Sequence, residues 1–442
     1  MAVVVFVSLC VLLVVGKVLR VQIPLLQRLY LPSSVVGGVV GLVVLSCFGD
    51  RLPPEIRETA SRCPGFLINV IFATIFLGAA VPKVKEVVNF ALPQLTLGQI
   101  IAWGQYVVGL GLAGFVLTRF FNVPAAFGNL LEIGFEGGHG TVGGMSEAFV
   151  AYGWEDGIAL GYTVATIGMI IGIVFGMVMI QIAHRRGIVN EVKSFRDRRP
   201  HERRGIHPPA SRPSAGLQTV FSDSIDSLAW HLAVVGLAML IGYGIHACIP
   251  LKGFPLFPLC MIGGVILSLG AKLLRTDLLV DRAQMERISG ASLDFLVVSA
   301  VATIRLEVVA RNWQPMVILV VAGAVWSVWC VFFVAPKIFR TAWFERAIAE
   351  FGQATGVTAT GLMLLRTVDP ENKTPAAMSF GYKQLLHEPF MGGGLWTALA
   401  LTLVYRIGWM KVFWISLAML VFWSVVAFVL YRRNRLFRKP GK

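Results

Sequence analysis

Long apolar segments, separated by short loops, constrain the fold of this chain more than any other feature of its sequence. A membrane-spanning helix needs about 20 mainly apolar residues, because each residue advances the helix by about 1.5 Å. The sequence therefore predicts an all-α polytopic membrane protein. The predicted spans are 1–19, 30–48, 64–81, 96–120, 157–183, 228–248, 254–271, 291–309, 314–337, 389–405 and 409–431.

The composition excludes several other classes of protein. Of the 442 residues, 56% are hydrophobic and 14% are charged, whereas a soluble domain has about 45–50% apolar and about 25% charged residues. A soluble enzyme, a disordered chain and a coiled coil are therefore excluded. The net charge of +15 would suggest nucleic-acid binding in a soluble protein. Here most Lys and Arg residues lie between or after apolar segments, so they indicate membrane orientation and no nucleic-acid partner.

The distribution of Lys and Arg predicts which side of the membrane each loop faces. With the N-terminus outside and one crossing per span, 30 of the 39 Lys and Arg residues fall on the cytoplasmic side. The positive-inside rule thus predicts an external N-terminus and a cytoplasmic C-terminus. It also places 51–62 outside and the basic stretch 184–226 in the cytoplasm.

A basic, Pro-rich linker at 184–227 separates two halves whose sequences match weakly. Each half has five spans and one further segment, at 125–150 or 341–366, that is too rich in Gly, Thr and Ser for a continuous apolar helix. Because five is odd, the second half would enter the membrane from the opposite side, as in an inverted-topology repeat. We therefore expect a first repeat at 1–183, a second at 228–407, and an extra C-terminal helix with a basic tail at 408–442. The matching positions are Pro32, Gly37 and Gly38 with Pro258, Gly263 and Gly264; Phe66, Ala73 and Thr74 with Phe295, Ala302 and Thr303; Asn89 and Pro93 with Asn312 and Pro315; and Glu132, Gly138 and Met145 with Glu350, Gly356 and Met363.

The two Gly-rich segments are interpreted as broken or re-entrant segments that meet near the membrane midplane and form one binding site. Unwound backbone at membrane depth is tolerated where it lines protein or a wet cavity, and its free N–H and C=O groups can bind ions or solutes. Close helix packing through small residues is the alternative. The first segment offers Glu136, Gly137, Gly138, His139, Gly140 and Thr141.

The second segment supplies neutral oxygen atoms, which suit a dehydrated sodium ion or a carboxylate. A threonine in a membrane helix often only bonds its own backbone, and this remains the alternative for each one. His387 and Glu388, further on, line the permeation path or lie at the cytoplasmic interface. The candidate residues of the second segment are Gly352, Gln353, Thr355, Gly356, Thr358 and Thr360, and sodium is expected at Thr141, Thr355 and Thr358.

Glu136 is the strongest candidate for a binding-site residue, because an ionisable group in a membrane segment must face a partner or a cavity. If it is ionised, it favours a cationic group of the solute or a coupling cation. If it is neutral, it can donate a hydrogen bond to an anionic solute. Exposure to water in a shallow segment is the alternative. His139 is either part of the site or a structural hydrogen-bonding residue.

The run Gly137-Gly138-His139-Gly140-Thr141 resembles the GGHGT motif of the bacterial sodium/glutamate symporter family. Pro32 with Gly37-Gly38, and Ala165-Thr166-Ile167-Gly168, are similar to further family positions. The resemblance covers most of 1–407. It implies inverted repeats, sodium coupling, an acidic amino-acid solute bound near Thr166 and the motif, a homodimer, and a bacterial inner-membrane location. Glu136 stands where the family has a small polar residue, and an ionised carboxylate there would repel a dicarboxylate solute.

The sequence therefore predicts a sodium-coupled symporter of a small amino-acid or organic-acid solute, glutamate-like by resemblance. No catalytic residue is expected and no cofactor besides the coupling sodium ion. The partners are the solute, sodium, the lipid bilayer and a second copy of the chain. A membrane-embedded enzyme is one alternative, although the chain has no HExxH or GxSxG motif. A non-transporting sensor on the same scaffold is another.

Overall fold

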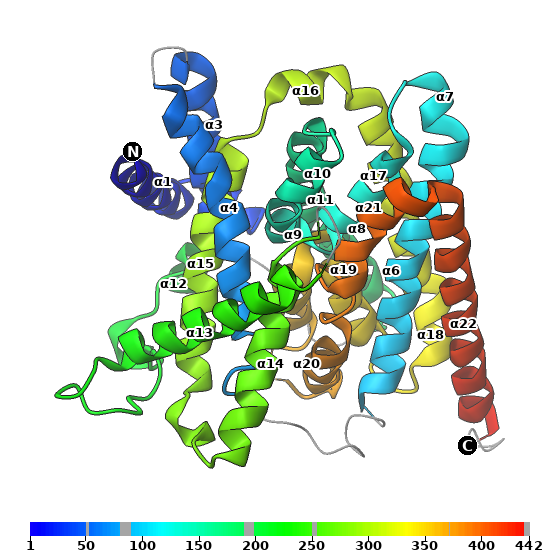
Figure 1. The fold of residues 1–442 in the computed structure, drawn as a ribbon. Helices are drawn as coiled ribbons and strands as arrows, with labels where there is room; N and C mark the ends of the chain where they lie inside the picture. Colours follow the sequence, from blue (N-terminus) through cyan, green and yellow to red (C-terminus); the bar gives the residue numbers. More distant parts are fainter. Residues whose placement is uncertain (50–52, 80–89, 190–198, 250–253, 371, 437–442) are drawn as a thin grey trace. The chain divides into compact units, whose positions relative to one another are not determined.

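A computed structural model describes residues 1–49, 53–79, 90–189, 199–249, 254–370 and 372–436, and throughout that part of the chain the regular elements are helices (Figure 1). Six of them are long and apolar enough to cross a membrane. They are α1 (Ala2–Gln22), α6 continuing to Phe120 (Leu92–Phe120), α11 (Asp156–Arg185), α13 (Ser227–Ala247), α17 with its extension (Trp313–Ile338), and α22 (Trp409–Asn434 of Trp409–Leu436). The prediction of an all-helical membrane protein is confirmed at this level.

Further helices occupy the remaining predicted spans. Three are shorter, namely α3 (Ser33–Phe48), α14 (Phe257–Leu273) and α21 (Leu395–Ile407), and two are more polar, namely α4 (Pro54–Thr74) and α15 (Arg282–Ala302). Two of these helices begin before the predicted apolar spans, α4 before residue 64 and α15 before residue 291. The prediction counted apolar residues, whereas both helices begin with polar turns that follow a helix-start signal. Pro54 opens α4, and the Asp281 side chain caps α15.

The chain forms two compact units, and each combines segments from both sequence halves. The first unit comprises Met1–Val81, His139–Ile158 and Arg199–Arg305. The second comprises Pro82–Gly138, Ala159–Arg198 and Leu306–Lys442. The linker predicted at 184–227 contains the short helix α12 (Pro200–Arg204), and its residues 190–198 lie outside the described residues, as does the tail from 437 onward.

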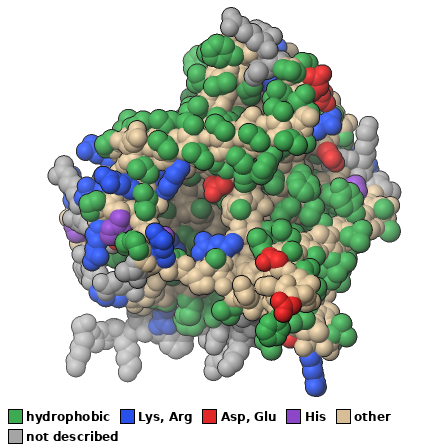
Figure 2. All heavy atoms as spheres, turned by 90° about the vertical axis from the view of Figure 1, so that its left-hand side faces the viewer, with side chains coloured by type: hydrophobic (Ala, Val, Ile, Leu, Met, Phe, Trp, Pro, Cys, Tyr) green, Lys and Arg blue, Asp and Glu red, His purple; other side chains and the backbone are tan. Residues whose placement is uncertain are grey.

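In the first unit, α1 packs against α3 and α13 against α14 through glycines. A Cβ atom at Gly37 would overlap the carbonyl oxygen of Leu12, and one at Gly263 would overlap that of Ala238. Close backbone approach of this kind is typical of membrane helices. The outer side of α1 is apolar and exposed, for example at Val3 and Val14. Figure 2 shows apolar side chains over much of one face of the molecule, with Lys and Arg gathered in groups among them.

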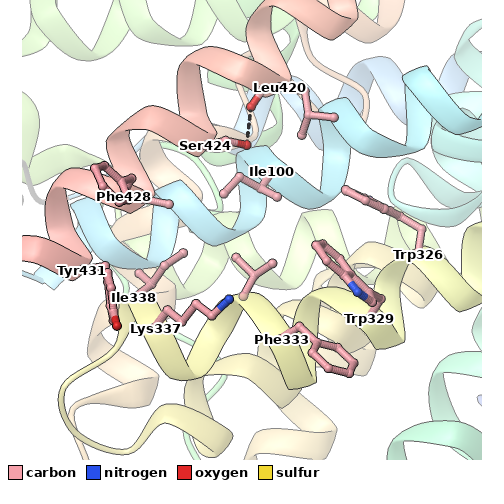
Figure 3. A pocket seen from close by; sticks show the side chains of 12 residues that line it. Ile100, Trp326, Trp329, Phe333, Lys337, Ile338, Leu420, Ser424, Phe428 and Tyr431 are labelled. Atoms are coloured by element: carbon pink, nitrogen blue, oxygen red, sulfur yellow. Dashed lines mark hydrogen bonds between the residues drawn. The ribbon is translucent and has the colours of Figure 1, made fainter.

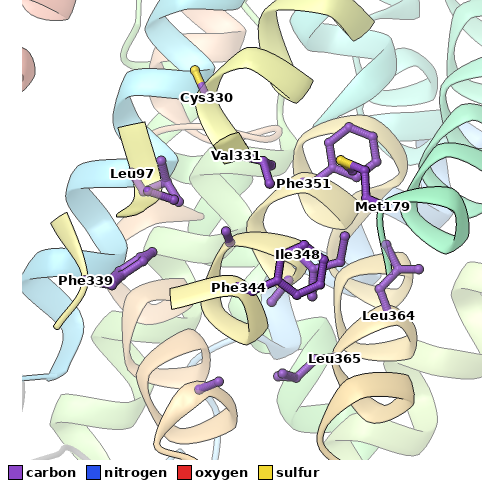
Figure 4. Packing of buried hydrophobic residues seen from close by; sticks show 14 of the residues in the cluster. Leu97, Met179, Cys330, Val331, Phe339, Phe344, Ile348, Phe351, Leu364 and Leu365 are labelled. Carbon is purple, nitrogen blue, oxygen red and sulfur yellow. The ribbon is translucent and has the colours of Figure 1, made fainter. Parts of the chain in front are cut away.

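The second unit has a core built by α6, α11, α17 and α19 (Trp343–Val368) (Figure 4). Phe344, Ile348 and Phe351 project from one side of α19 at helical spacing and are fully buried. This packing fixes the first half of α19 and therefore the polar side chains on its other positions. The labelled core residues are Leu97, Met179, Cys330, Val331, Phe339, Phe344, Ile348, Phe351, Leu364 and Leu365.

Candidate functional site

Both predicted broken segments are interrupted, and their breaks touch within the second unit. The helix α8 (Leu130–Phe135) ends before Glu136, and α9 (Gly138–Gly144) begins after Gly137. Gly138 has φ of +68°, and a Cβ atom there would overlap the Cγ1 atom of Val357. In α19, Gly356 and Val357 are non-helical, and Val357 has φ of +62° and ψ of 172°. That region is nearly exclusive to glycine, so the second break is a strained position.

Glu136, at the first break, lies close to residues of two helices from the second half of the sequence. Its Oε1 atom is hydrogen-bonded by His387 Nε2, from α20 (Ala376–His387), and lies 3.5 Å from Gln353 Nε2 on α19. The side chains of Glu136 and His387 are almost completely buried. The Oε2 atom of Glu136 is buried and has no hydrogen-bond partner among the described residues. One oxygen of this carboxyl group is therefore not satisfied by the described residues.

Two successive hydrogen bonds determine which ring nitrogen of His387 carries the proton. Trp103 Nε1 donates to Gln99 Oε1 over 2.8 Å, and an indole N–H can only donate, so it orients the Gln99 amide. The amide nitrogen of Gln99 then lies 3.1 Å from His387 Nδ1 and donates to it. An imidazole that accepts at Nδ1 carries its proton on Nε2. His387 is thus a neutral donor to Glu136, and it orients one oxygen of that group.

A buried ion pair lies next to Glu136. Lys383 Nζ is 3.1 Å from Glu350 Oε2, and the two side chains are 0% and 1% exposed. Lys383 also donates to Gln353 Oε1 over 2.8 Å, and Gln94 Nε2 donates to Glu350 Oε1 over 2.8 Å. The hydrogen bonds to each partner offset the cost of removing two charges from water. Gln353 therefore links the ion pair to Glu136.

Glu132, one turn before Glu136 on α8, has a separate set of partners. Tyr106 OH donates to its Oε2 over 2.5 Å, while the Gly392 backbone N–H and the Thr397 hydroxyl donate to its Oε1 over 2.9 and 2.8 Å. Both oxygens of this buried carboxyl group are satisfied. Glu132 therefore has a structural role, because it holds the loop before α21 against α8. Glu136, by contrast, has one oxygen without a partner among the described residues.

The predicted hydroxyl-bearing residues divide into two kinds. Thr358 donates to Glu388 Oε1 over 2.9 Å and accepts from Gln384 over 2.6 Å, so it belongs to a side-chain network. Thr355 and Thr166 donate to the carbonyl oxygens of Phe351 and Tyr162, their own helices. Thr360 and Gly352 are buried at the close approach of the two parts of α19. Sodium binding by Thr355 and Thr358 stays a prediction, as does a role of the others in the site.

The motif residues after Gly138 belong to the first unit. Within that unit, His139 and Thr141 are buried, and a Cβ atom at Gly140 would lie 2.6 Å from Ile68 Cδ1. The predicted motif is therefore divided between the two compact units, with Gly137 and Gly138 in the second and His139, Gly140 and Thr141 in the first. The boundary between the two units in the sequence falls directly after Gly138, at the first helix break.

Several residues of the site were missed by reasoning from the sequence, among them Glu350, which was matched only to Glu132, and Gln384. Lys383 precedes His387 by one helical turn, and it was passed over as part of a polar stretch near a membrane boundary. Gln99 and Trp103 were absorbed into an apolar span. Their signal is nevertheless present, because Gln94, Gln99 and Gln105 are three amides inside one membrane segment, where polar side chains are costly. All three amides are buried.

Buried, paired ionisable residues at the contact of interrupted membrane helices are typical of one class of protein, the secondary transporters. The sodium/glutamate symporter family model matches residues 1–368, and the chain belongs to this family. It is accordingly a transmembrane protein of a family that carries amino acids by symport with sodium. None of the curated proteins compared with the chain matches it. The matched residues include Glu136, Glu350 and Gln353 but end before Lys383, His387 and Glu388.

Proposed function

We propose that this chain is a sodium-coupled symporter of a small amino-acid or organic-acid solute, with its site at the contact of the two helix breaks in the second unit. The observation that carries the proposal is the contact of Gly138 with Val357, which brings Glu136 and Gln353 together. Interrupted helices in corresponding places of two repeats are the usual position of transporter binding sites. Glu136 Oε2, buried and without a partner among the described residues, is oriented for a cation or a donor group of the solute.

In the second unit, the sodium ligands proposed are the hydroxyl oxygens of Thr355 and Thr358, with backbone carbonyls from the breaks. A sodium ligand at Thr141, in the first unit, is proposed from the sequence alone. A hydroxyl that donates to a carbonyl keeps its lone pairs, so the bond of Thr355 to Phe351 leaves its oxygen able to ligate. Hard oxygen ligands suit a small cation. The role of His139, Gly140, Thr166, Thr360, Gly352 and Glu388 in binding is part of the same proposal.

The inverted repeat is a proposal supported by matched contacts in the first unit. Gly38 on α3 approaches Val301 near the end of α15, and Gly264 on α14 approaches Ala73 near the end of α4. The third helix of each half is thus the neighbour of the second helix of the other half. A π-helical turn also follows the fourth helix of each half, at Ala113–Leu117 (η3) and Cys330–Val334 (η8). Such reciprocal contacts are expected of two halves related by a pseudo-two-fold axis.

The orientation, the bacterial inner-membrane location and the homodimer belong to the proposal as well. The positive-inside rule supports an external N-terminus, and the family resemblance supports the location and the dimer. The solute remains open between glutamate and a solute with fewer negative charges. Among the described residues of the second unit, the buried carboxyl groups outnumber the buried basic groups, which favours the second kind. The carboxyl groups are those of Glu132, Glu136, Glu350 and Asp369, and the basic groups are those of Arg346 and Lys383.

Uptake into proteoliposomes tests the function directly. The purified chain is reconstituted, and uptake of radiolabelled glutamate and of labelled neutral amino acids and monocarboxylates is measured under an inward sodium gradient. We expect uptake of one of these solutes and its counterflow when sodium is present on both sides. Uptake that is unchanged when choline replaces sodium, but lost when the pH gradient is collapsed, would contradict sodium coupling. Absence of counterflow for the whole panel would favour the enzyme or sensor alternative.

A further inference from the structure

An apolar groove lies in the second unit, away from the helix breaks (Figure 3). Its volume is about 250 Å³. One wall is a ladder of stacked rings in which Trp326 and Trp329 have centroids 5.4 Å apart, and Trp329 and Phe333 5.9 Å apart. Trp329 is 45% and Phe333 57% exposed, so this wall faces the surroundings of the protein. The lining is completed by Ile100, Val334, Lys337, Ile338, Leu420, Ser424, Ala427, Phe428 and Tyr431.

The local helix geometry creates this groove. The π-helical turn Cys330–Val334 separates α17 (Trp313–Trp329) from α18 (Ala335–Ile338) and shifts the side chains that follow it. On α22, the small residues Ser424 and Ala427 face the groove and leave space. The Ser424 hydroxyl donates to the carbonyl oxygen of Leu420 over 2.7 Å, so the floor offers an apolar contact (Figure 3).

A second cavity of about 520 Å³, lined in part by polar and basic residues and called the polar cavity below, adjoins the groove. The two cavities share Lys337 and Tyr431, and the second adds Arg340, Thr341 and Asn434, with Pro336 and Phe339. Lys337 and Arg340 are exposed. Asn434 donates to the carbonyl oxygen of Ile338 over 2.9 Å, which fixes the end of α22 beside α18. The described lining of this cavity thus carries two positive charges and no acidic residue.

We propose that the groove and the polar cavity together bind one phospholipid with an anionic headgroup. An acyl chain lies along the aromatic wall and α22, and the phosphate group contacts Lys337 and Arg340. An extended peptide would leave its backbone groups unsatisfied against this apolar wall, whereas an acyl chain has none to satisfy. Because every lipid has apolar chains, the basic residues provide the selectivity, and basic pockets at the ends of membrane helices are suited to anionic headgroups.

Quenching of tryptophan fluorescence by brominated lipids tests this site in the full-length protein. The protein is reconstituted in phosphatidylcholine vesicles that contain a variable fraction of phosphatidylglycerol or phosphatidylcholine with brominated acyl chains. Two basic contacts predict half-maximal quenching at an about tenfold lower fraction of the anionic lipid. The variant Trp329→Phe should reduce the part of the quenching that distinguishes the anionic lipid, because its ring, with that of Trp326, lines the groove.

The variant Lys337→Gln/Arg340→Gln should remove the preference for the anionic lipid. Lys272→Gln/Arg275→Gln is the matched control, since it removes the same two exposed charges at the same spacing from the end of α14, and it should keep the preference. Equal quenching by both lipids, or a preference that survives in the first variant, would overturn the proposal. Displacement by inorganic phosphate alone would indicate a simple anion pocket and also overturn it. Absence of quenching, with cross-linking between two chains through a cysteine at Phe333, would show that a second copy covers the groove instead.

Discussion

The surroundings of Glu136 make it the residue whose charge decides what the site accepts. Its Oε1 atom is held by His387, and Gln353 connects it to the Lys383–Glu350 ion pair. Its Oε2 atom has no partner among the described residues. A buried carboxyl oxygen without a partner is costly, and binding of a cation or a donor group relieves that cost.

Replacing Glu136 by glutamine keeps the shape of the side chain and removes its charge. If the group is ionised beside the ligand, Glu136→Gln should lower sodium-driven uptake about tenfold or more at every pH, because a hydrogen bond to a charged group contributes about 1.5–3 kcal/mol. Glu147→Gln, on an exposed side chain, is the control. Near-normal uptake with a flattened alkaline limb would show instead a neutral Glu136. Full activity with unaltered pH and sodium dependence would show that Glu136 has no role in transport.

Trp103 is a positioning residue whose effect travels through Gln99 and His387. The variant Trp103→Phe removes the indole donor, so the Gln99 amide can rotate and His387 can shift its proton between the ring nitrogens. We expect uptake between that of the native protein and that of Glu136→Gln, together with a changed pH profile. Trp414→Phe, on an exposed ring of α22, should change neither. An unchanged pH profile in Trp103→Phe would mean that the ring of Trp103 only packs against its neighbours.

The Lys383–Glu350 pair gives a prediction for stability. Lys383→Met leaves a buried carboxylate without its cation and should cost about 3–5 kcal/mol, while the double variant with Glu350→Gln should recover a large part of it. The comparison pair is Glu58–Arg62, whose side chains are 61% and 78% exposed. Arg62→Met should cost about 1 kcal/mol or less. Thermal unfolding in detergent measures each change, and equal costs at the two pairs would contradict the prediction.

At the scale of elements, apolar length and Gly content predicted the helices and the two breaks, since both depend on local sequence. The helix starts at Pro54 and Arg282 were missed because polar first turns have no apolar signal. The network around Glu136 could not be predicted either. Its members lie up to 288 residues apart, as between Gln99 and His387, and one sequence does not show which residues meet. The same limit concealed the contact of Gly138 with Val357.

The contact between the two breaks depends on the absence of a side chain at Gly138. Gly138→Ala places a methyl group against Val357 in a left-handed conformation, which alone costs about 1–2 kcal/mol. We therefore expect a lower unfolding temperature and reduced uptake, with partial recovery in Gly138→Ala/Val357→Gly. Gly290→Ala is the control, because a Cβ atom there meets nothing within 4 Å and alanine favours the interior of α15 by about 0.5–1 kcal/mol. A similar response of both glycines would contradict the role assigned to the break.

At the scale of the whole molecule, the two compact units do not follow the two sequence halves. The first three long helices of each half, α1, α3 and α4 with α13, α14 and α15, belong to the first unit. The later helices of both halves belong to the second, except for the stretch His139–Ile158, which holds most of α9 and the helix α10 (Ser146–Ala151) and belongs to the first. A fold of this kind requires both halves to be inserted before either unit is complete. The orientation of the halves in the membrane is therefore the property on which the inverted repeat depends.

Single cysteines in a cysteine-free background test this orientation. Glu58→Cys lies on an exposed position at the start of α4, in the predicted external loop, and Ser214→Cys lies on an exposed position of the predicted cytoplasmic linker. An impermeant maleimide applied to intact cells should label residue 58, and it should label residue 214 only after the membrane is opened. The reason is the excess of Lys and Arg on one side, which is retained in the cytoplasm during insertion. Labelling of residue 214 in intact cells would reverse the orientation, and labelling of both would place them on one side. The first result would contradict the predicted direction of insertion. The second would contradict the predicted odd number of crossings, on which the inverted repeat depends.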